Sequence, residues 1–447
     1  MREGSLEAPT RHPIAWREEA YYDADAIDAE LRRVFDICHS CRRCFNLCDA
    51  FPRLFDLIDE SATGELDSVD SKDFKPVVDA CTLCDMCFMT KCPYVPPHEF
   101  DIDFPHLMLR YRAAELRLGA RPRIDRELAK TDRNGRIGTR LAPLANWATR
   151  RDNGLTRPLI EALADIDRNA EIPPFAPAPA VIGADAEPPA LNRAAPAYGQ
   201  RRAVLYATCF GNYNDQRPLA AARTVLAHNG VETVVRHPAC CGMPKLENGD
   251  LAGVAAAAGE VAADLLPFID DGFDIIAVVP SCALMLKFEW PLILPDDDRI
   301  RRLATATFDV AEYVLDIKKR HGLVDGLAPL AGGISVHLAC HARAQNMGAK
   351  AAEMLRLIPG TGITVVERCS GHGGKWGMMK AHFATASKVG RPAARRQKES
   401  GAAHRCSECP LAGIHLEQLV EGEAATSKRL RQPHPIELLA ESYGLSF

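Results

Sequence analysis

Two short cysteine runs near the N-terminus have the residue type and spacing of a metal-binding sequence. The first run, CHSCRRCFNLC, has C-x2-C-x2-C-x3-C spacing, and the second, CTLCDMCFMTKCP, has C-x2-C-x2-C-x4-C-P spacing. Three cysteines spaced in this way can surround one face of an iron–sulfur cubane, and thiolates suit iron because they are soft, anionic donors. The two runs therefore predict two [4Fe–4S] clusters.

The assignment of these eight cysteines to two clusters rests on ligand exchange between the runs. In two-cluster ferredoxins the fourth cysteine of each run ligates the other cluster. On that rule the ligands are, for cluster 1, Cys38, Cys41, Cys44 and Cys92, and for cluster 2, Cys48, Cys81, Cys84 and Cys87. The x4 spacing before Cys92 and the Asp49 that follows Cys48 depart from the usual x3 spacing and following proline. A pair of zinc sites is the alternative, although zinc knuckles separate C-x2-C pairs by a longer spacer.

The other eight cysteines fall into two groups in the C-terminal half of the chain. The first group is Cys209, Cys240, Cys241 and Cys282, and the second is Cys340, Cys369, Cys406 and Cys409. Each cysteine ends an apolar run or begins a turn, and parallel α/β proteins bind ligands at the carboxyl edge of their strands. Each group therefore predicts up to one further [4Fe–4S] cluster, whereas the alternative is a degenerate group of inert, buried thiols.

No nucleotide or flavin fingerprint accompanies the cysteines, and no catalytic residue is predicted. The glycine-rich segment GHGGKWG (371–377) lacks the Gly-Lys-Ser/Thr of a P-loop and has Trp376 at the last glycine position of GxGxxG. Hydrogen bonding to the cysteine loops, in preference to metal ligation or a proton relay, is expected of His237, His337, His341 and His372. The arginine run RPAARRQK (391–398) is expected to be a solvated helix face, in preference to a surface for an acidic partner or lipid headgroups.

Composition describes a chain that can bury large cores. The 447 residues are 47% hydrophobic and carry a net charge of -5, which argues against a nucleic-acid partner. The first twenty residues contain no secretory apolar segment, and the longest stretch without Asp, Glu, Lys or Arg, 326–342, contains a proline and three glycines. We therefore expect a cytoplasmic protein with at most peripheral membrane association, in which the 16 cysteines bind metal or do redox chemistry.

The elements that must position the cysteines change along the chain. A helical pattern covers about 104–118, helix-forming residues continue to about 170, and a Pro/Ala-rich segment at 171–199 indicates a semi-rigid linker. Buried strands are expected at 203–209, 231–237, 273–281, 334–340 and 363–369. Helices are expected near 219–228, 251–267, 308–315, 348–357 and 434–442. This alternation predicts parallel α/β units, and its recurrence predicts two copies of one domain.

The predicted fold is therefore α+β and α/β, in parts that follow one another along the chain. Its parts are an N-terminal arm (1–30), a helical two-cluster 4Fe-4S ferredoxin-type domain (31–118), a helical connector with the Pro/Ala-rich linker (119–200), and two repeated α/β domains (201–325 and 326–447).

The arrangement C…CCG…CxxC, duplicated behind a two-cluster ferredoxin module, resembles the CCG-domain iron–sulfur proteins related to heterodisulfide reductase. The resemblance is greatest to the C subunits of anaerobic glycerol-3-phosphate dehydrogenase, through VERCSGHGGKWGMMK (366–380) and CSECPLAGIHLEQ followed by HPIELLAES. It implies that both α/β repeats are CCG domains. Each repeat has four cysteines instead of the family's five, with Val279 in place of one and Ser370 in place of another.

The resemblance implies an iron–sulfur electron-transfer subunit of an oxidoreductase that lacks its own substrate dehydrogenase site. Such a subunit relays electrons between a partner, a flavin-dependent dehydrogenase or another redox protein, and a quinone or other acceptor. Two further hypotheses stay open: a thiol–disulfide reductase that works at Cys240 and Cys241, and a zinc-stabilised interaction scaffold.

Overall fold

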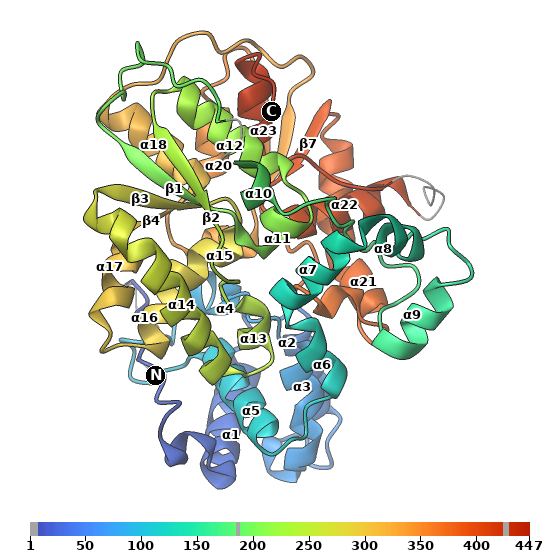
Figure 1. The fold of residues 1–447 in the computed structure, drawn as a ribbon. Coiled ribbons are helices and arrows are strands. Elements are labelled where there is room, and N and C mark those ends of the chain that lie inside the picture. Colours follow the sequence, from blue (N-terminus) through green and yellow to red (C-terminus); the bar gives the residue numbers. More distant parts are fainter. Residues whose placement is uncertain (1–7, 185–187, 423–428) are drawn as a thin grey trace.

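The computed structural model describes residues 8–184, 188–422 and 429–447. The first seven residues of the predicted arm and residues 185–187 of the predicted linker lie outside the described residues. The N-terminal helices lie together at one end of the molecule, and two α/β units lie beyond them (Figure 1). A mixed helical and parallel α/β protein, as the sequence predicts, is confirmed.

The cysteine-rich N-terminal part is a helical region, residues 24–117, built around aromatic side chains. Its helices are α1 (Ala24–Cys41), α2 (Ala50–Asp59), α3 (Lys75–Ala80), α4 (Met86–Thr90) and α5 (Phe104–Arg117). The Asp23 carboxylate accepts the Ala26 N–H at 2.7 Å and so caps α1. Phe51 lies 4.7 Å from Phe104, ring centre to ring centre, and both are buried in the core of this region.

The connector is helical, as its composition predicts, and it lies beside the red and orange C-terminal helices in Figure 1. Its helices are α6 (Arg123–Leu128), α7 (Thr131–Arg140), α8 (Ala142–Ala148) and α9 (Arg157–Ala164). In its described residues the Pro/Ala-rich segment contains one short helix, α10 (Ala180–Ala184), which its composition does not predict. It forms in a stretch without proline, AVIGA, so the backbone N–H groups that a helix needs are present.

The first α/β unit, residues 202–320, contains a parallel sheet in the order β2-β1-β3-β4. Its strands are β1 (Arg202–Tyr206), β2 (Glu232–Arg236), β3 (Phe273–Ala277) and β4 (Thr307–Asp309). Its main helices are α12 (Arg217–His228), α14 (Leu251–Asp270), α17 (Asp298–Ala306) and α18 (Val310–Arg320). The helix expected near 308–315 is present but begins at Val310, because residues 307–309 form a short strand. The break falls at Asp309, whose capping box with Glu312 starts α18.

The second α/β unit, residues 334–442, has the strand order β6-β5-β7, all parallel. Its strands are β5 (Ile334–His337), β6 (Ile363–Val366) and β7 (His404–Ser407). Its main helices are α20 (Lys350–Leu355), α21 (Phe383–Glu399), α22 (Pro410–Glu421) and α23 (Pro435–Ser442). In both units the first strand lies between the second and the third. That both units are CCG domains stays a prediction.

Short helices follow most strands, and several cysteines lie in these helices or in the turns before them. The short helices are α11 (Thr208–Tyr213), α13 (Met243–Glu247), α15 (Pro280–Leu284), α16 (Trp290–Ile293) and α19 (Cys340–Ala344). Within each sheet all strands are parallel, so their carboxyl ends lie at one edge. Six of the seven described strands, all but β4, are followed by a cysteine-bearing loop, and these loops lie in one region of the molecule.

The helical region and the two α/β units pack closely. Arg112 of α5 donates to the Glu247 carbonyl at 3.1 Å and to the Val78 carbonyl at 2.6 Å. Gly249 has a φ of +80°, and a Cβ there would lie 2.5 Å from the backbone nitrogen of Ala113, so only glycine fits. Helices α12 and α18 of the first unit pack against α23 and α20 of the second.

Among the described helices, only α14 is long and apolar enough to cross a membrane by length and composition. It packs against β3 and α17, and its buried face includes Val254, Val261 and Leu265. Helix α14 therefore packs as a core helix of the first α/β unit does.

Candidate metal centre

The first cysteine group lies where α1 ends. Burial raises the pKa of Cys38, and the thiols of Cys92, Cys44 and Cys41 raise it further, so these four side chains lie together. Arg42, between Cys41 and Cys44, has a φ of 51° and turns the chain sharply after the helix. The structure thus gathers the four residues that the sequence analysis assigns to cluster 1.

The second group lies next to the first. Burial raises the pKa of Cys48, and the thiols of Cys84 and Cys81 raise it further. Burial also raises the pKa of Cys87, as do the thiols of Cys84, Cys81 and Cys48. Positive φ values at Leu83 (48°) and Asp85 (62°) fold the backbone tightly on both sides of Cys84. These are the four residues assigned to cluster 2.

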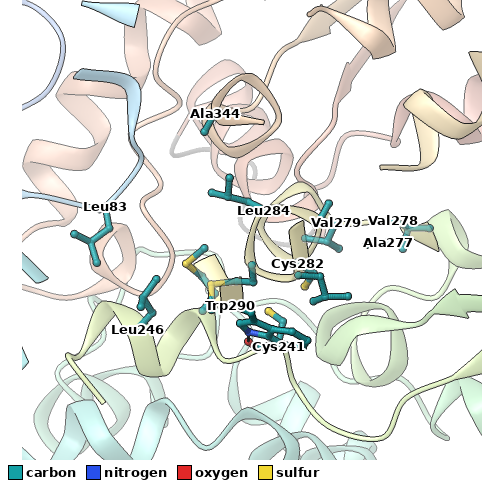
Figure 2. Packing of buried hydrophobic residues seen from close by; sticks show 14 of the residues in the cluster. Leu83, Cys241, Leu246, Ala277, Val278, Val279, Cys282, Leu284, Trp290 and Ala344 are labelled. Atoms are coloured by element: carbon teal, nitrogen blue, oxygen red, sulfur yellow. Dashed lines mark hydrogen bonds between the residues drawn. The ribbon is translucent and has the colours of Figure 1, made fainter. Parts of the chain in front are cut away.

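The third group, in the first α/β unit, gathers all four of its predicted members. The sulfurs of Cys209 and Cys240 are 3.6 Å apart. Hydrogen bonding with Cys209 and Cys241 holds the pKa of Cys240 well below its usual value. Hydrogen bonds with Cys240 and Cys282 raise the pKa of Cys241. The indole N–H of the buried Trp290 donates to the Cys241 carbonyl at 3.0 Å, which fixes this turn against the core (Figure 2).

The fourth group gathers three of its four predicted members. Burial raises the pKa of Cys340, and the thiols of Cys84, Cys369 and Cys409 raise it further. Cys406 instead lies inside β7, fully buried, where burial and the carboxylates of Glu408 and Glu437 raise its pKa. The structure does not bring Cys406 to the other three.

A cavity of about 280 Å³ lies between the two α/β units and the helical region. The cysteines on its wall are Cys84, Cys209, Cys240, Cys241, Cys282, Cys340, Cys369 and Cys409. Cys369 lines this cavity, and its side chain is accessible. The surrounding protein still desolvates the thiol and raises its pKa. Leu83, Leu246 and Ala344, from the three regions around it, belong to one buried apolar cluster (Figure 2).

The four groups follow one another in space. Cys44 of the first group raises the pKa of Cys87 in the second, alongside the larger effect of burial. Cys84 of the second group acts in the same way on Cys340 of the fourth. Burial raises the pKa of Cys409, and Cys282 of the third group adds to that rise. The order in space is therefore first, second, fourth, third.

Backbone N–H groups point at the cysteine sulfurs in a regular pattern. Gly371 donates to the Cys369 sulfur at 3.3 Å, two residues along the chain. The same i+2 relation holds for the pairs Cys48–Ala50, Cys81–Leu83, Cys84–Met86, Cys92–Tyr94 and Cys240–Gly242. Such donors stabilise negative charge on sulfur, so the loops fit thiolate ligands of a buried, charged cofactor.

The connector contributes residues that the sequence analysis missed. Asp132 of α7 accepts the backbone N–H of Cys240 at 2.7 Å, and its other oxygen lies 2.7 Å from Nε2 of His237. Thr131 lines the cavity beside it. No sequence signal marks this contact, because Asp132 and Cys240 are separated by 108 positions.

Three of the four histidines beside the cysteines have hydrogen-bond partners that account for them. His237 pairs with Asp132, His337 contacts the Ser407 hydroxyl at 2.9 Å, and His341 contacts the Ser281 hydroxyl at 2.7 Å. In His372 the Nε2 atom is buried and without a hydrogen-bond partner among the described residues, as is the Nδ1 atom of His237. Burial lowers the pKa of His372 to about 3, so its ring is neutral.

The arginine run forms the exposed face of α21, as the sequence predicts. Arg391, Arg395, Arg396 and Lys398 are exposed, and together with Arg368 they line an open groove against α22.

A mixed helical and parallel α/β protein with cysteines at the carboxyl edges of its sheets is the class that this fold and site define. Residues 203–287 match the family model for the CCG cysteine-rich domain, so the recognition of this domain from the sequence is confirmed. Over 320 residues the chain is 27% identical to the C subunit of the anaerobic glycerol-3-phosphate dehydrogenase of Escherichia coli K12, a match that covers 70% of this chain and 76% of that relative. The corresponding protein of Escherichia coli O157:H7 matches to the same extent.

Proposed function

We propose that this protein is an iron–sulfur electron-transfer subunit of an oxidoreductase complex. The observation that carries the proposal is the spatial series of four cysteine groups, in which each group lies within charge interaction of the next. When bound, [4Fe–4S] clusters exchange single electrons, so a series of them is a conduit through the protein. The cluster 1 cysteines lie at one end of the series, and the third group, Cys209 to Cys282, lies at the other.

Backbone N–H groups aimed at the sulfurs support clusters over single ions. Such donors stabilise the negative charge that a [4Fe–4S] cluster and its thiolate ligands carry together. The i+2 donors at Cys48, Cys84 and Cys369 are of this kind.

Substrate oxidation belongs to a partner in this proposal. The relative is named as one subunit of a dehydrogenase, which supports an assembly in which another chain, a flavin-dependent dehydrogenase or a similar redox protein, supplies the electrons. A quinone or another acceptor receives them. The complex works in the cytoplasm, with peripheral contact to the membrane where the acceptor is a quinone.

Metal analysis of anaerobically purified protein tests the proposal. Four clusters correspond to about 16 iron and 16 acid-labile sulfide per chain, and the ferredoxin-type pair alone to about 8 of each. Reduced protein is expected to show electron paramagnetic resonance signals of several interacting clusters. Colourless protein with stoichiometric zinc would contradict the proposal and favour the interaction scaffold.

A thiol–disulfide reductase is the second candidate. It is favoured by the position of Cys240 and Cys241 on the cavity wall, with the sulfur of Cys209 3.6 Å from that of Cys240. This function predicts that the wild-type protein reduces a small disulfide with dithionite-reduced viologen as donor, and that Cys241→Ser abolishes the reaction. Absence of the activity in wild-type protein with a full complement of iron eliminates this candidate.

A further inference from the structure

The fourth cysteine group lacks one thiol, although its other three members face the central cavity. In β7, Cys406 and Ser407 point to opposite faces of the sheet, as successive strand residues do. The Ser407 hydroxyl reaches His337, which lines the cavity, whereas Cys406 belongs to the buried apolar cluster. In the described part of the chain, the cavity wall does not include Cys406.

Cys406 also lacks the donors that its neighbours have. Backbone N–H groups of Gly371 and of Leu411 and Ala412 point at the sulfurs of Cys369 and Cys409. The Cys406 sulfur instead lies near the carboxylates of Glu408 and Glu437, whose charge opposes a thiolate there. The surroundings of Cys406 are thus those of a neutral, packed thiol.

His372 has the features of a ligand on the same cavity wall. It is 6% exposed, it lines the cavity with Cys340, Cys369 and Cys409, and its Nε2 has no hydrogen-bond partner within the described residues. A buried polar atom without a partner is unfavourable, and a bond to iron would satisfy Nε2 of His372.

The loop around His372 is held rigidly. The Gly377 N–H donates to the His372 carbonyl at 2.7 Å. A Cβ at Gly371, which has a φ of +75°, would lie 2.0 Å from the Ala386 carbonyl oxygen, so the loop packs directly on α21. The ring of His372 is therefore fixed in place three residues after Cys369, on the turn that carries that cysteine.

We propose that His372 Nε2, with the thiolates of Cys340, Cys369 and Cys409, completes the ligand set of the fourth cysteine group. This inference rests on the proposed iron–sulfur function. Imidazole replaces thiolate as an iron ligand in Rieske centres, where the reduction potential is higher than with cysteine alone. A neutral ligand removes one negative charge, so this cluster is expected to have a higher potential than an all-cysteine version.

Pulsed electron paramagnetic resonance on wild-type protein tests the bond without any variant. Protein labelled with 15N-histidine and reduced stepwise is expected to show strong nitrogen coupling to one cluster signal. The coupling must disappear in His372→Cys. A wild-type spectrum with no such coupling at any potential would overturn the inference.

Three variants with iron counts give a second test. His372→Ala is expected to lose about 4 of about 16 iron, because the cluster that it ligates is lost, whereas His372→Cys keeps all iron and shows a lower potential for that cluster. Cys406→Ala, the matched control, is expected to keep both iron and spectrum. Iron loss in Cys406→Ala together with full iron in His372→Ala would assign the fourth ligand to Cys406 and refute the inference.

Different results would contradict the iron–sulfur function and the role of His372. Wild-type protein with zinc and no labile sulfide contradicts the iron–sulfur function itself. Wild-type protein with about 12 or more iron but no nitrogen-coupled cluster contradicts only the role of His372.

Discussion

The imidazole of His341 and the hydroxyl of Ser281 join the two α/β units at the wall of the cavity, with Nδ1 2.7 Å from Oγ. The other ring nitrogen lies 3.2 Å from the Leu83 carbonyl of the helical region. These three residues are the chain neighbours of Cys340, Cys282 and Cys84. One buried side chain therefore fixes the relative positions of three cysteine groups.

Replacement of His341 tests this link. His341→Phe keeps the ring volume but leaves the Ser281 hydroxyl and the Leu83 carbonyl without partners, at a cost of about 1–3 kcal/mol for each group. Thermal unfolding of anaerobic protein should begin at a lower temperature, and electron equilibration among the clusters should slow. Ser281→Ala, which breaks only one of the two bonds, is the matched control. Equal effects of the two variants would show that the Leu83 bond contributes nothing.

Arg11 supports a second junction between the helical region and the first α/β unit. Its guanidinium lies 2.7 Å from Asp85, 2.9 Å from Asp103 and 3.0 Å from Glu289. Arg11→Met leaves buried carboxylates uncompensated and is expected to destabilise the protein by about 3–5 kcal/mol. Arg395→Met removes an exposed pair with Glu399 on α21 and should change stability by at most about 1 kcal/mol.

Denaturant unfolding measures both variants under the same anaerobic conditions. Because several regions unfold, the onset of the first transition is the quantity to compare. An onset for Arg11→Met that equals the wild-type value would show that the junction does not depend on this ion-pair network.

The elements were predictable where local pattern decides them. Strand β1 is buried along Ala203, Val204, Leu205 and Tyr206, so its apolar run predicts it directly. Strand β7 (HRCS) was missed, because its polar residues find partners that no local pattern reveals. Arg405 pairs with Glu417 at 2.7 Å, and Ser407 pairs with His337.

At the site, too, prediction from sequence is limited by dependence on the tertiary fold. Spacing predicts which cysteines share a loop, but the face of a strand on which a side chain lies depends on where the strand begins. For this reason CSEC predicts Cys406 and Cys409 equally, although only Cys409 faces the cavity. The role of Asp132 also depends on the tertiary fold, which brings α7 beside the Cys240 loop.

Double variants test the exchange of the fourth cysteine between the two ferredoxin-type clusters. If Cys92 and Cys38 ligate one cluster, Cys38→Ala with Cys92→Ala should lose about 4 iron, as either single variant does. Cys81→Ala with Cys92→Ala should lose about 8, because two clusters are affected. The reverse pattern of iron loss would mean that each run ligates its own cluster.

Asp309, which caps α18, makes the stability of the protein depend on pH. Burial raises its pKa from 3.8 to about 6, against the Ala311 N–H and the charge of Lys287, which lower it. Between these values the native state binds the proton and the unfolded state does not, so stability falls as pH rises from about 4 to about 6. Asp309→Asn preserves a capping side chain and removes this titration.

Unfolding free energies at pH 5 and pH 8 measure the effect. The change in the free energy of unfolding caused by Asp309→Asn should be more stabilising at pH 8 than at pH 5 by about 1 kcal/mol, since one pKa unit is about 1.4 kcal/mol. Asp297→Asn is the control, because Asp297 caps α17 and a hydrogen bond from Arg299 holds its pKa below 3.8. Its stabilising contribution is complete above its unfolded pKa and is lost only as pH falls through the lowered one, so Asp297→Asn should have the same effect at both pH values. A pH-independent effect of Asp309→Asn would mean that Asp309 is already ionised at pH 5, held in that form by Lys287 and the N-terminus of α18.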